Sequence, residues 1–118
     1  MADGSWVKEF PGFVVVSDVA GVIIDMNDRA VEWFADKGGR ELLGKSLLDV
    51  HKEQSQDKIK GMMASNRTNV YTIEKGGVRV LIYQSPWYRD GKFAGLVEFG
   101  LEVPPEIPHH VRAPKQES

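Results

Sequence analysis

The feature that most constrains the fold of this chain is a turn between two short apolar runs near the N-terminus. The runs cover residues 13–16 and 22–24, and the turn at residues 18–21 reads Asp-x-x-Gly. Apolar β-branched runs that flank a turn of this composition predict a β-hairpin. Asn27 follows the hairpin and precedes the amphipathic segment 28–34, where its side chain is placed to cap a helix. The chain therefore begins with two strands and a short helix.

Two later turns predict how three further strands pair. A tight turn at Gly76-Gly77 sets Asn69 opposite Gln84, and a second turn at Asp90-Gly91 sets Gln84 opposite Val97. One face of these strands is then almost wholly apolar and is expected to meet the core, with Gln84 as its exception. This expected core face holds Tyr71, Ile73, Val78, Val80, Ile82, Gln84, Val97, Phe99, Leu101 and Val103. Glu98 and Leu96 are expected on the opposite face.

Composition limits the classes of protein to which the chain can belong. Its 118 residues, of which 42% are hydrophobic and 27% charged, fit one globular domain. The net charge of -2 and the lack of a basic run argue against nucleic-acid binding. No apolar run reaches the roughly 20 residues of a membrane span, so we expect no membrane partner. The absence of cysteine excludes disulfides, thiolate metal sites and haem attached through cysteine, and it makes a cytoplasmic protein the default expectation.

The hairpin, the following Asn27 and the later segment Gly91-Lys92-Phe93-Ala94-Gly95 before an alternating strand together resemble the PAS domain family. The resemblance implies an α+β fold, a five-stranded antiparallel sheet with short helices packed on one face. It divides the chain into an N-terminal segment, residues 1–11, that caps the sheet or forms a dimer element, a PAS domain at residues 12–103, and an extended Pro-rich tail at residues 104–118. The missing cysteine also excludes covalent flavin or coumaroyl chromophores of light-sensing relatives.

The resemblance also implies a ligand site between the sheet and the helices. The residues expected there are Trp33, Phe34, His51, Ile59, Met62, Met63, Tyr71, Gln84, Val97 and Phe99. His51 is a candidate haem ligand or hydrogen-bonding group, or else a solvated or capping residue. An unpaired buried amide at Gln84 would cost roughly 1–3 kcal/mol, so either Asn69 or a ligand must pair with it. The same residues would equally fill a solid core.

These observations favour a single-domain sensory module over two alternatives. It would bind a small ligand non-covalently, such as a metabolite, flavin or haem, and pass the signal through a homodimer or a signalling partner. The dimer surface would comprise Leu81, Tyr83, Trp87 and Leu96 on the sheet, with Trp6 and Phe10 of the N-terminal segment. One alternative is a ligand-free dimerisation module with a filled core. The other is a small cone-shaped enzyme, which is disfavoured because Asp25 and Glu98 are expected to point away from the cavity.

Overall fold

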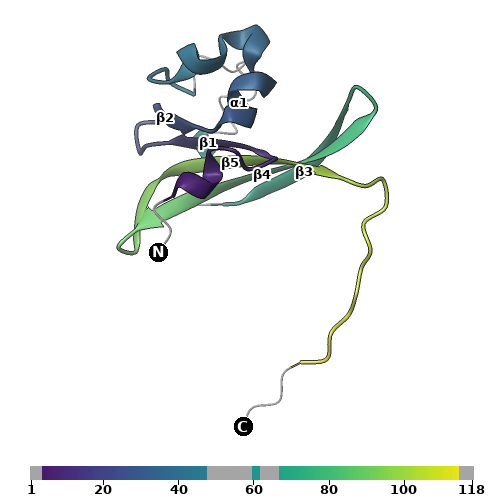
Figure 1. Ribbon diagram of the computed structural model, residues 1–118. Coiled ribbons are helices and arrows are strands. Elements are labelled where there is room, and N and C mark those ends of the chain that lie inside the picture. Colours follow the sequence, from purple (N-terminus) through teal and green to yellow (C-terminus); the bar gives the residue numbers. More distant parts are fainter. Residues whose placement is uncertain (1–3, 48–59, 62–66, 115–118) are drawn as a thin grey trace.

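Five antiparallel strands form one sheet in the order β2-β1-β5-β4-β3, and the short helices that follow β2 lie over one of its faces (Figure 1). The computed structural model describes residues 4–47, 60–61 and 67–114. The strands are β1 (Phe13–Ser17), β2 (Ile23–Met26), β3 (Asn69–Lys75), β4 (Val78–Arg89) and β5 (Lys92–Val103). The short helices are the α-helix α1 (Asp28–Trp33) and the 3-10 helices η1 (Ser5–Val7), η2 (Ala35–Lys37) and η3 (Gly39–Leu42), and residues 60–61 are also α-helical. None of the helices in these described ranges is long and apolar enough to cross a membrane.

The predicted hairpin and its helix cap are both confirmed. The Asp18 carboxylate closes the turn between β1 and β2, because its Oδ1 accepts hydrogen bonds from the backbone N–H groups of Ala20 at 2.9 Å and Val22 at 3.0 Å. Asn27 caps α1 through its Oδ1, which accepts from the Ala30 N–H at 3.0 Å. Local side-chain chemistry therefore determines the turn between β1 and β2 and the start of α1.

Asn27 also holds the N-terminal segment against the sheet. Its Oδ1 accepts a second hydrogen bond from the Val14 N–H at 2.9 Å, and its Nδ2 donates to the carbonyl oxygens of Val7 at 3.0 Å and Gly12 at 2.8 Å. The side chain is 4% exposed. One buried amide thus joins η1, the chain before β1, β1 itself and the start of α1.

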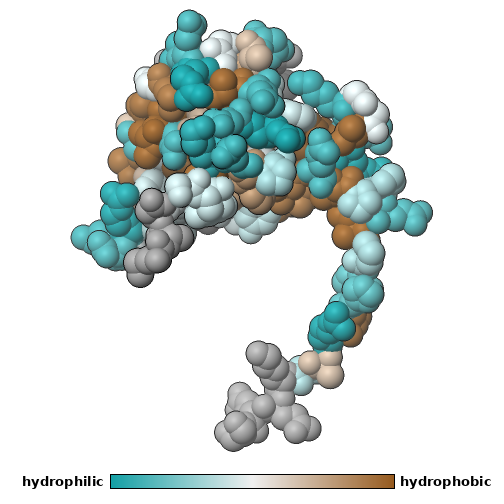
Figure 2. Space-filling model, in the orientation of Figure 1, coloured by the Kyte–Doolittle hydropathy of each residue, from teal (hydrophilic) through white to brown (hydrophobic). Residues whose placement is uncertain are grey.

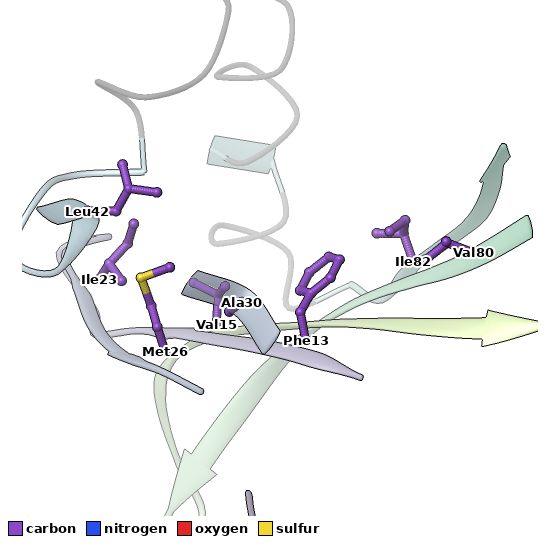
Figure 3. Close-up of a cluster of buried hydrophobic side chains, with 8 residues drawn as sticks. All are labelled: Phe13, Val15, Ile23, Met26, Ala30, Leu42, Val80 and Ile82. Carbon is purple, nitrogen blue, oxygen red and sulfur yellow. The ribbon is translucent and has the colours of Figure 1, made fainter. Parts of the chain in front are cut away.

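The hydrophobic core lies between the helices and the face of the sheet that we call the inner face (Figure 3). Its buried members are Phe13, Val15, Ile23, Met26, Ala30, Leu42, Val80 and Ile82. The Phe13 ring packs against the rings of Trp33 and Phe34, with centroids 5.2 Å and 5.3 Å away. It lies so close to Gly100 on β5 that a Cβ there would come within 1.9 Å of Phe13 Cε2. Gly100 therefore makes room for the largest buried side chain.

Strands β3 and β4 pair as the sequence predicts, but β4 and β5 do so only near their turn. Asn69 lies opposite Gln84, as expected. Tyr88 pairs with Phe93, but Trp87 pairs with Gly95, so Ala94 is an extra residue in β5. Beyond this bulge Gln84 faces Glu98 rather than Val97.

Close approach of two backbones explains the bulge. Gly95 has a φ of 145°, and a Cβ at this position would lie 1.9 Å from the Ser17 carbonyl oxygen at the end of β1. Only glycine fits this contact, and the strand kinks where it occurs. The indole N–H of Trp87 donates to the same Ser17 oxygen at 2.9 Å.

Because of the bulge, the β5 residues from Leu96 onward lie on the face of the sheet opposite to the one predicted. The predicted faces of this part of β5 are therefore wrong. Leu96, Glu98, Gly100 and Glu102 lie on the inner face, in register with Pro86, Gln84, Ile82 and Val80 of β4. Val97, Phe99, Leu101 and Val103 lie on the opposite, outer face. Leu96, which was expected in the dimer surface, is 6% exposed and belongs to the inner face. A shift of one residue has this effect because side chains alternate between the faces.

After β5 the chain leaves the sheet as an extended segment, residues 104–114, that runs away from the rest of the protein (Figure 1). The guanidinium of Arg79 donates to the Pro105 carbonyl oxygen at 2.6 Å and fixes where this segment starts. Prolines favour such an extended conformation over a helix.

Candidate functional site

Three polar side chains from neighbouring strands form a hydrogen-bonded row across the inner face. Asn69 on β3, Gln84 on β4 and Glu98 on β5 are opposed in register. The Asn69 Nδ2 donates to Gln84 Oε1 at 2.8 Å, and the Gln84 Nε2 donates to Glu98 Oε2 at 2.5 Å. All three side chains are half-buried. We call this set the polar row.

The polar row lies between two apolar pairs of the same strands. Pro86 and Leu96 are opposed on one side of it, and Ile82 and Gly100 on the other, and all four are buried. A carboxylate among apolar neighbours requires hydrogen bonds to offset its lost hydration. Gln84 provides one of these bonds to Glu98, and Asn69 in turn fixes the orientation of the Gln84 amide. Among the described residues, no buried side-chain nitrogen or oxygen lacks a partner.

Tyr71 extends the site by one register position toward the turn between β3 and β4. It faces Ile82 and is two residues from Asn69 on the same side of β3. Burial raises the pKa of the Tyr71 phenol, and the negative charge of Glu98 adds to the increase. The hydroxyl is therefore neutral at physiological pH and able to donate a hydrogen bond. The side chain is nevertheless 41% exposed, so solvent reaches the inner face here.

The structure brings together only part of the predicted ligand site. Tyr71 and Gln84 lie on the inner face, and the predicted pairing of Gln84 with Asn69 is present. Trp33 and Phe34 pack against Phe13, and the Lys75 ammonium lies 4.5 Å from the centroid of the Trp33 ring. Val97 and Phe99 were placed on the wrong face and belong to the outer face. His51, Ile59, Met62 and Met63 lie outside the described residues.

Glu98 is the residue of this site that sequence reasoning missed. It was expected on the outer face because the prediction assumed that the register set by the turn at Asp90-Gly91 holds along all of β5. Gly95 was the available signal, since a glycine inside a strand often indicates a bulge or a close backbone approach. Because Glu98 lies on the inner face, its position gives no reason to exclude an enzyme.

Comparison with solved structures identifies the fold. The PAS domain of BvgS from Bordetella pertussis superposes with a TM-score of 0.63 at 14% identity, over 84% of this chain and 82% of that chain. The Aer2 receptor from Vibrio cholerae, described as a dual PAS-heme oxygen sensor, gives a TM-score of 0.57 at 15% identity. The match covers 79% of this chain and 95% of the Aer2 chain. VqmA bound to DPO gives a TM-score of 0.62 at 17% identity, and the match covers 84% of this chain and 56% of the VqmA chain.

No protein-family model matches the sequence, and no curated protein does either. The structural similarity, together with the five-stranded antiparallel sheet and its short helices, shows that the chain has the PAS fold. The fold class expected from the hairpin, the asparagine cap and the later glycine-containing turn is confirmed.

Proposed function

We propose that this PAS-fold domain is a sensory module that binds a small ligand non-covalently at the polar row and passes its occupancy to a dimer interface or a partner protein. The observation that carries this proposal is the position of Glu98, a carboxylate on the inner face between two buried apolar pairs. In a purely structural core an ionisable group at such a position would not add to the stability of the fold, because burying its charge costs free energy.

Partial exposure of the site supports ligand binding rather than a filled core. Asn69, Gln84 and Glu98 are half-buried, and Tyr71 is 41% exposed although it shares their face. Ligand sites combine apolar walls with a few placed polar groups, which is the composition found here. The VqmA structure carries bound DPO and Aer2 is described as a haem sensor, so two proteins of this fold bind small molecules. A metabolite, a flavin and haem are the ligand classes proposed for this chain.

Strand β5 offers a direct route from the ligand to the outer face. Glu98 belongs to the polar row, whereas its chain neighbours Val97 and Phe99 lie on the outer face. A displacement of Glu98 on ligand binding would therefore move both neighbours with it. The ligand would change the outer face to the extent that it binds one arrangement of β5 more tightly than the other.

The outer face is the proposed dimer surface. Side chains at its centre are apolar, and they include Leu81 and Tyr83 of the original expectation together with Val97, Phe99 and Leu101 in place of Leu96. Apolar side chains reach the surface at the level of the sheet (Figure 2). In the N-terminal segment Trp6 is 61% exposed and packs edge-on against Phe10, with ring centroids 6.0 Å apart. VqmA has been solved as a dimer, which supports the same assembly here.

Native mass spectrometry tests ligand binding. The purified protein is expected to carry a mass that is lost on denaturation, and the Gln84→Leu variant, which removes both amide hydrogen bonds of the polar row, is expected to lose it. Thr72→Val on the exposed side of β3 serves as the control and should retain the mass. Wild-type protein that stays unliganded after incubation with a small-molecule extract of its expression host would favour the ligand-free interaction module instead.

Size-exclusion chromatography with light scattering tests the dimer surface. Tyr83 on the outer face is 40% exposed, and Tyr88 in the same strand, beyond the bulge, is 50% exposed. Tyr83→Glu is expected to convert the dimer to a monomer, because it adds a charge at the centre of the apolar surface. Tyr88→Glu is the matched control and should stay dimeric. A monomeric wild-type protein, or a Tyr83→Glu protein that remains dimeric, would exclude this surface.

A further inference from the structure

We propose that residues 109–113, which lie in the extended segment after β5, add as a sixth strand to the exposed edge of β3 in a second copy of this chain. The partner is a second copy, and each copy receives the segment of the other. The inference goes beyond the proposed function, because it concerns a contact outside the polar row and needs no ligand there.

The extended segment at residues 104–114, which we call the tail, carries apolar side chains into solvent. All of its residues are exposed, and Ile107 and Val111 are 57% and 87% exposed. Figure 1 shows that the tail leaves the sheet on the side opposite α1, η2 and η3, and in Figure 2 it is an arm separate from the rest of the protein. The tail therefore does not pack against its own domain.

The prolines divide the tail into a spacer and a segment that is able to pair. Proline has no N–H to donate to a neighbouring strand, and it occurs at positions 104, 105, 108 and 114. Residues 109–113 contain no proline, so each of them has both backbone groups for pairing. In a strand, Val111 and Ala113 would share one face, with His110 and Arg112 on the other. This segment thus has the length and the alternation of a short strand.

Strand β3 offers the complementary backbone groups, because it is an edge strand. It stands at the end of the strand order β2-β1-β5-β4-β3 and pairs with β4 on one side. The other side of an edge strand presents N–H and C=O groups to which a further chain can bond. Val70, Thr72 and Glu74 are exposed, Val70 to 49%. Extended peptides bind sheets by adding a strand at such an edge.

Arg79 places the start of the tail beside β3 of the same copy. Its guanidinium donates to the Pro105 carbonyl oxygen at 2.6 Å and lies 3.6 Å from the Glu74 carboxylate. The start of the tail and the receiving strand are therefore neighbours. A two-fold axis close to Arg79 would bring the tail of each copy to the β3 edge of the other, so that both tails exchange together and the assembly closes as a dimer.

The spacer at residues 104–108 has the reach and the stiffness for this exchange. At about 3.1 Å per residue it spans roughly 16 Å, and its prolines favour an extended chain. A chain that is already extended loses less conformational freedom when it docks. The spacer leads away from its own sheet on the outer-face side, which is also the side of the proposed dimer surface. A second copy on that side is thus the sheet that residues 109–113 meet.

Paramagnetic NMR on mixed copies of the full chain tests this contact. The chain has no cysteine, so Pro114→Cys gives a single attachment point for a nitroxide directly after the pairing segment. Nitroxide-carrying copies are mixed with isotope-labelled wild-type copies, and every specific loss of amide signal is then intermolecular. We expect Val70, Thr72 and Glu74 to lose most of their signal and to regain it when the nitroxide is reduced.

Two proline variants assign the contact to the pairing segment. Val111→Pro removes an N–H from the centre of that segment, whereas Ile107→Pro makes the matched change in the spacer, which is already extended. Val111→Pro in the nitroxide-carrying copies should abolish the signal loss at β3, and Ile107→Pro should preserve it. In sedimentation equilibrium, Val111→Pro should raise the dimer dissociation constant about tenfold and Ile107→Pro by less than about twofold. Both positions lie in the exposed tail, so neither variant disturbs the folded domain.

Three results would overturn the inference. They are an unchanged β3 signal in the mixed sample, a loss confined to outer-face residues such as Leu81 and Tyr83, and equal effects of the two proline variants. The proposed function is judged separately, because the retention of a ligand in native mass spectrometry does not involve the tail. A protein that retains a ligand while its β3 signals stay unchanged keeps the proposed function and contradicts this inference alone.

Discussion

Replacing Asn27 with alanine should destabilise this domain far more than the loss of an ordinary helix cap. Loss of an asparagine cap costs about 1 kcal/mol. Here the same change also leaves the buried Val14 N–H without its acceptor, at about 1–3 kcal/mol, and removes the two bonds that Asn27 donates to the Val7 and Gly12 carbonyls, at about 0.5–1.5 kcal/mol each. We expect a total of about 3–5 kcal/mol, because water will replace part of the carbonyl bonds.

Urea unfolding followed by circular dichroism measures this loss. With a slope of about 1–3 kcal/mol per molar urea, the midpoint should fall by about 2 M. Asn27→Ser is the control for the cap alone, since serine caps helices as well as asparagine does but lacks the amide N–H groups that donate to the two carbonyls. It should lose about 1 kcal/mol less than the alanine variant. A loss near 1 kcal/mol in the alanine variant would contradict this prediction, because it would reduce Asn27 to a simple cap.

Three further predictions concern residues of the inner face. Gly100→Ala places a Cβ within 1.9 Å of the Phe13 ring, which is 2% exposed, so urea unfolding should reveal a loss of about 1–3 kcal/mol in the free energy of unfolding. Gly61→Ala is the control: Gly61 is helical and no atom lies within 4 Å of an added Cβ, so this change should stabilise the protein by up to about 1 kcal/mol. The raised pKa of Tyr71 means that the folded state holds its phenolic proton more tightly than the unfolded state, so the free energy of unfolding should fall as pH rises above 10.0 and through the folded-state pKa. Ultraviolet titration should show that Glu98→Gln reduces this increase in the Tyr71 pKa without abolishing it, since burial is its larger cause. An unchanged pKa would contradict the electrostatic effect of Glu98 on Tyr71.

Local chemistry made much of the fold predictable. The turn at Asp18 and the cap at Asn27 each depend on hydrogen bonds to residues within four positions along the chain. The two glycines between β3 and β4 likewise determine a register that holds along the whole pair. Because Gln84 and Asn69 lie in that pair, this half of the polar row was predicted correctly.

The remaining half depends on contacts between distant parts of the chain. The bulge in β5 exists because Gly95 meets the backbone of Ser17, and pattern reasoning on β5 alone does not contain that contact. Because of this one extra residue, Glu98 lies in the site and Val97 and Phe99 lie outside it, contrary to the prediction. The hydrogen bonds from Asn27 to Val7 and Gly12 were unforeseen for the same reason, since their donor lies 20 and 15 residues away from its acceptors.

NMR of the side-chain amides tests whether this domain senses a ligand on the inner face, at the polar row. The NH₂ signals of Asn69 and Gln84 are assigned by comparison with the Asn69→Asp and Gln84→Glu variants and followed while low-molecular-weight extract of the expression host is added. We expect both signals to shift as the ligand binds, together with the backbone signal of Glu98. Shifts confined to outer-face residues such as Leu81 and Tyr83, or no shifts at all, would contradict it.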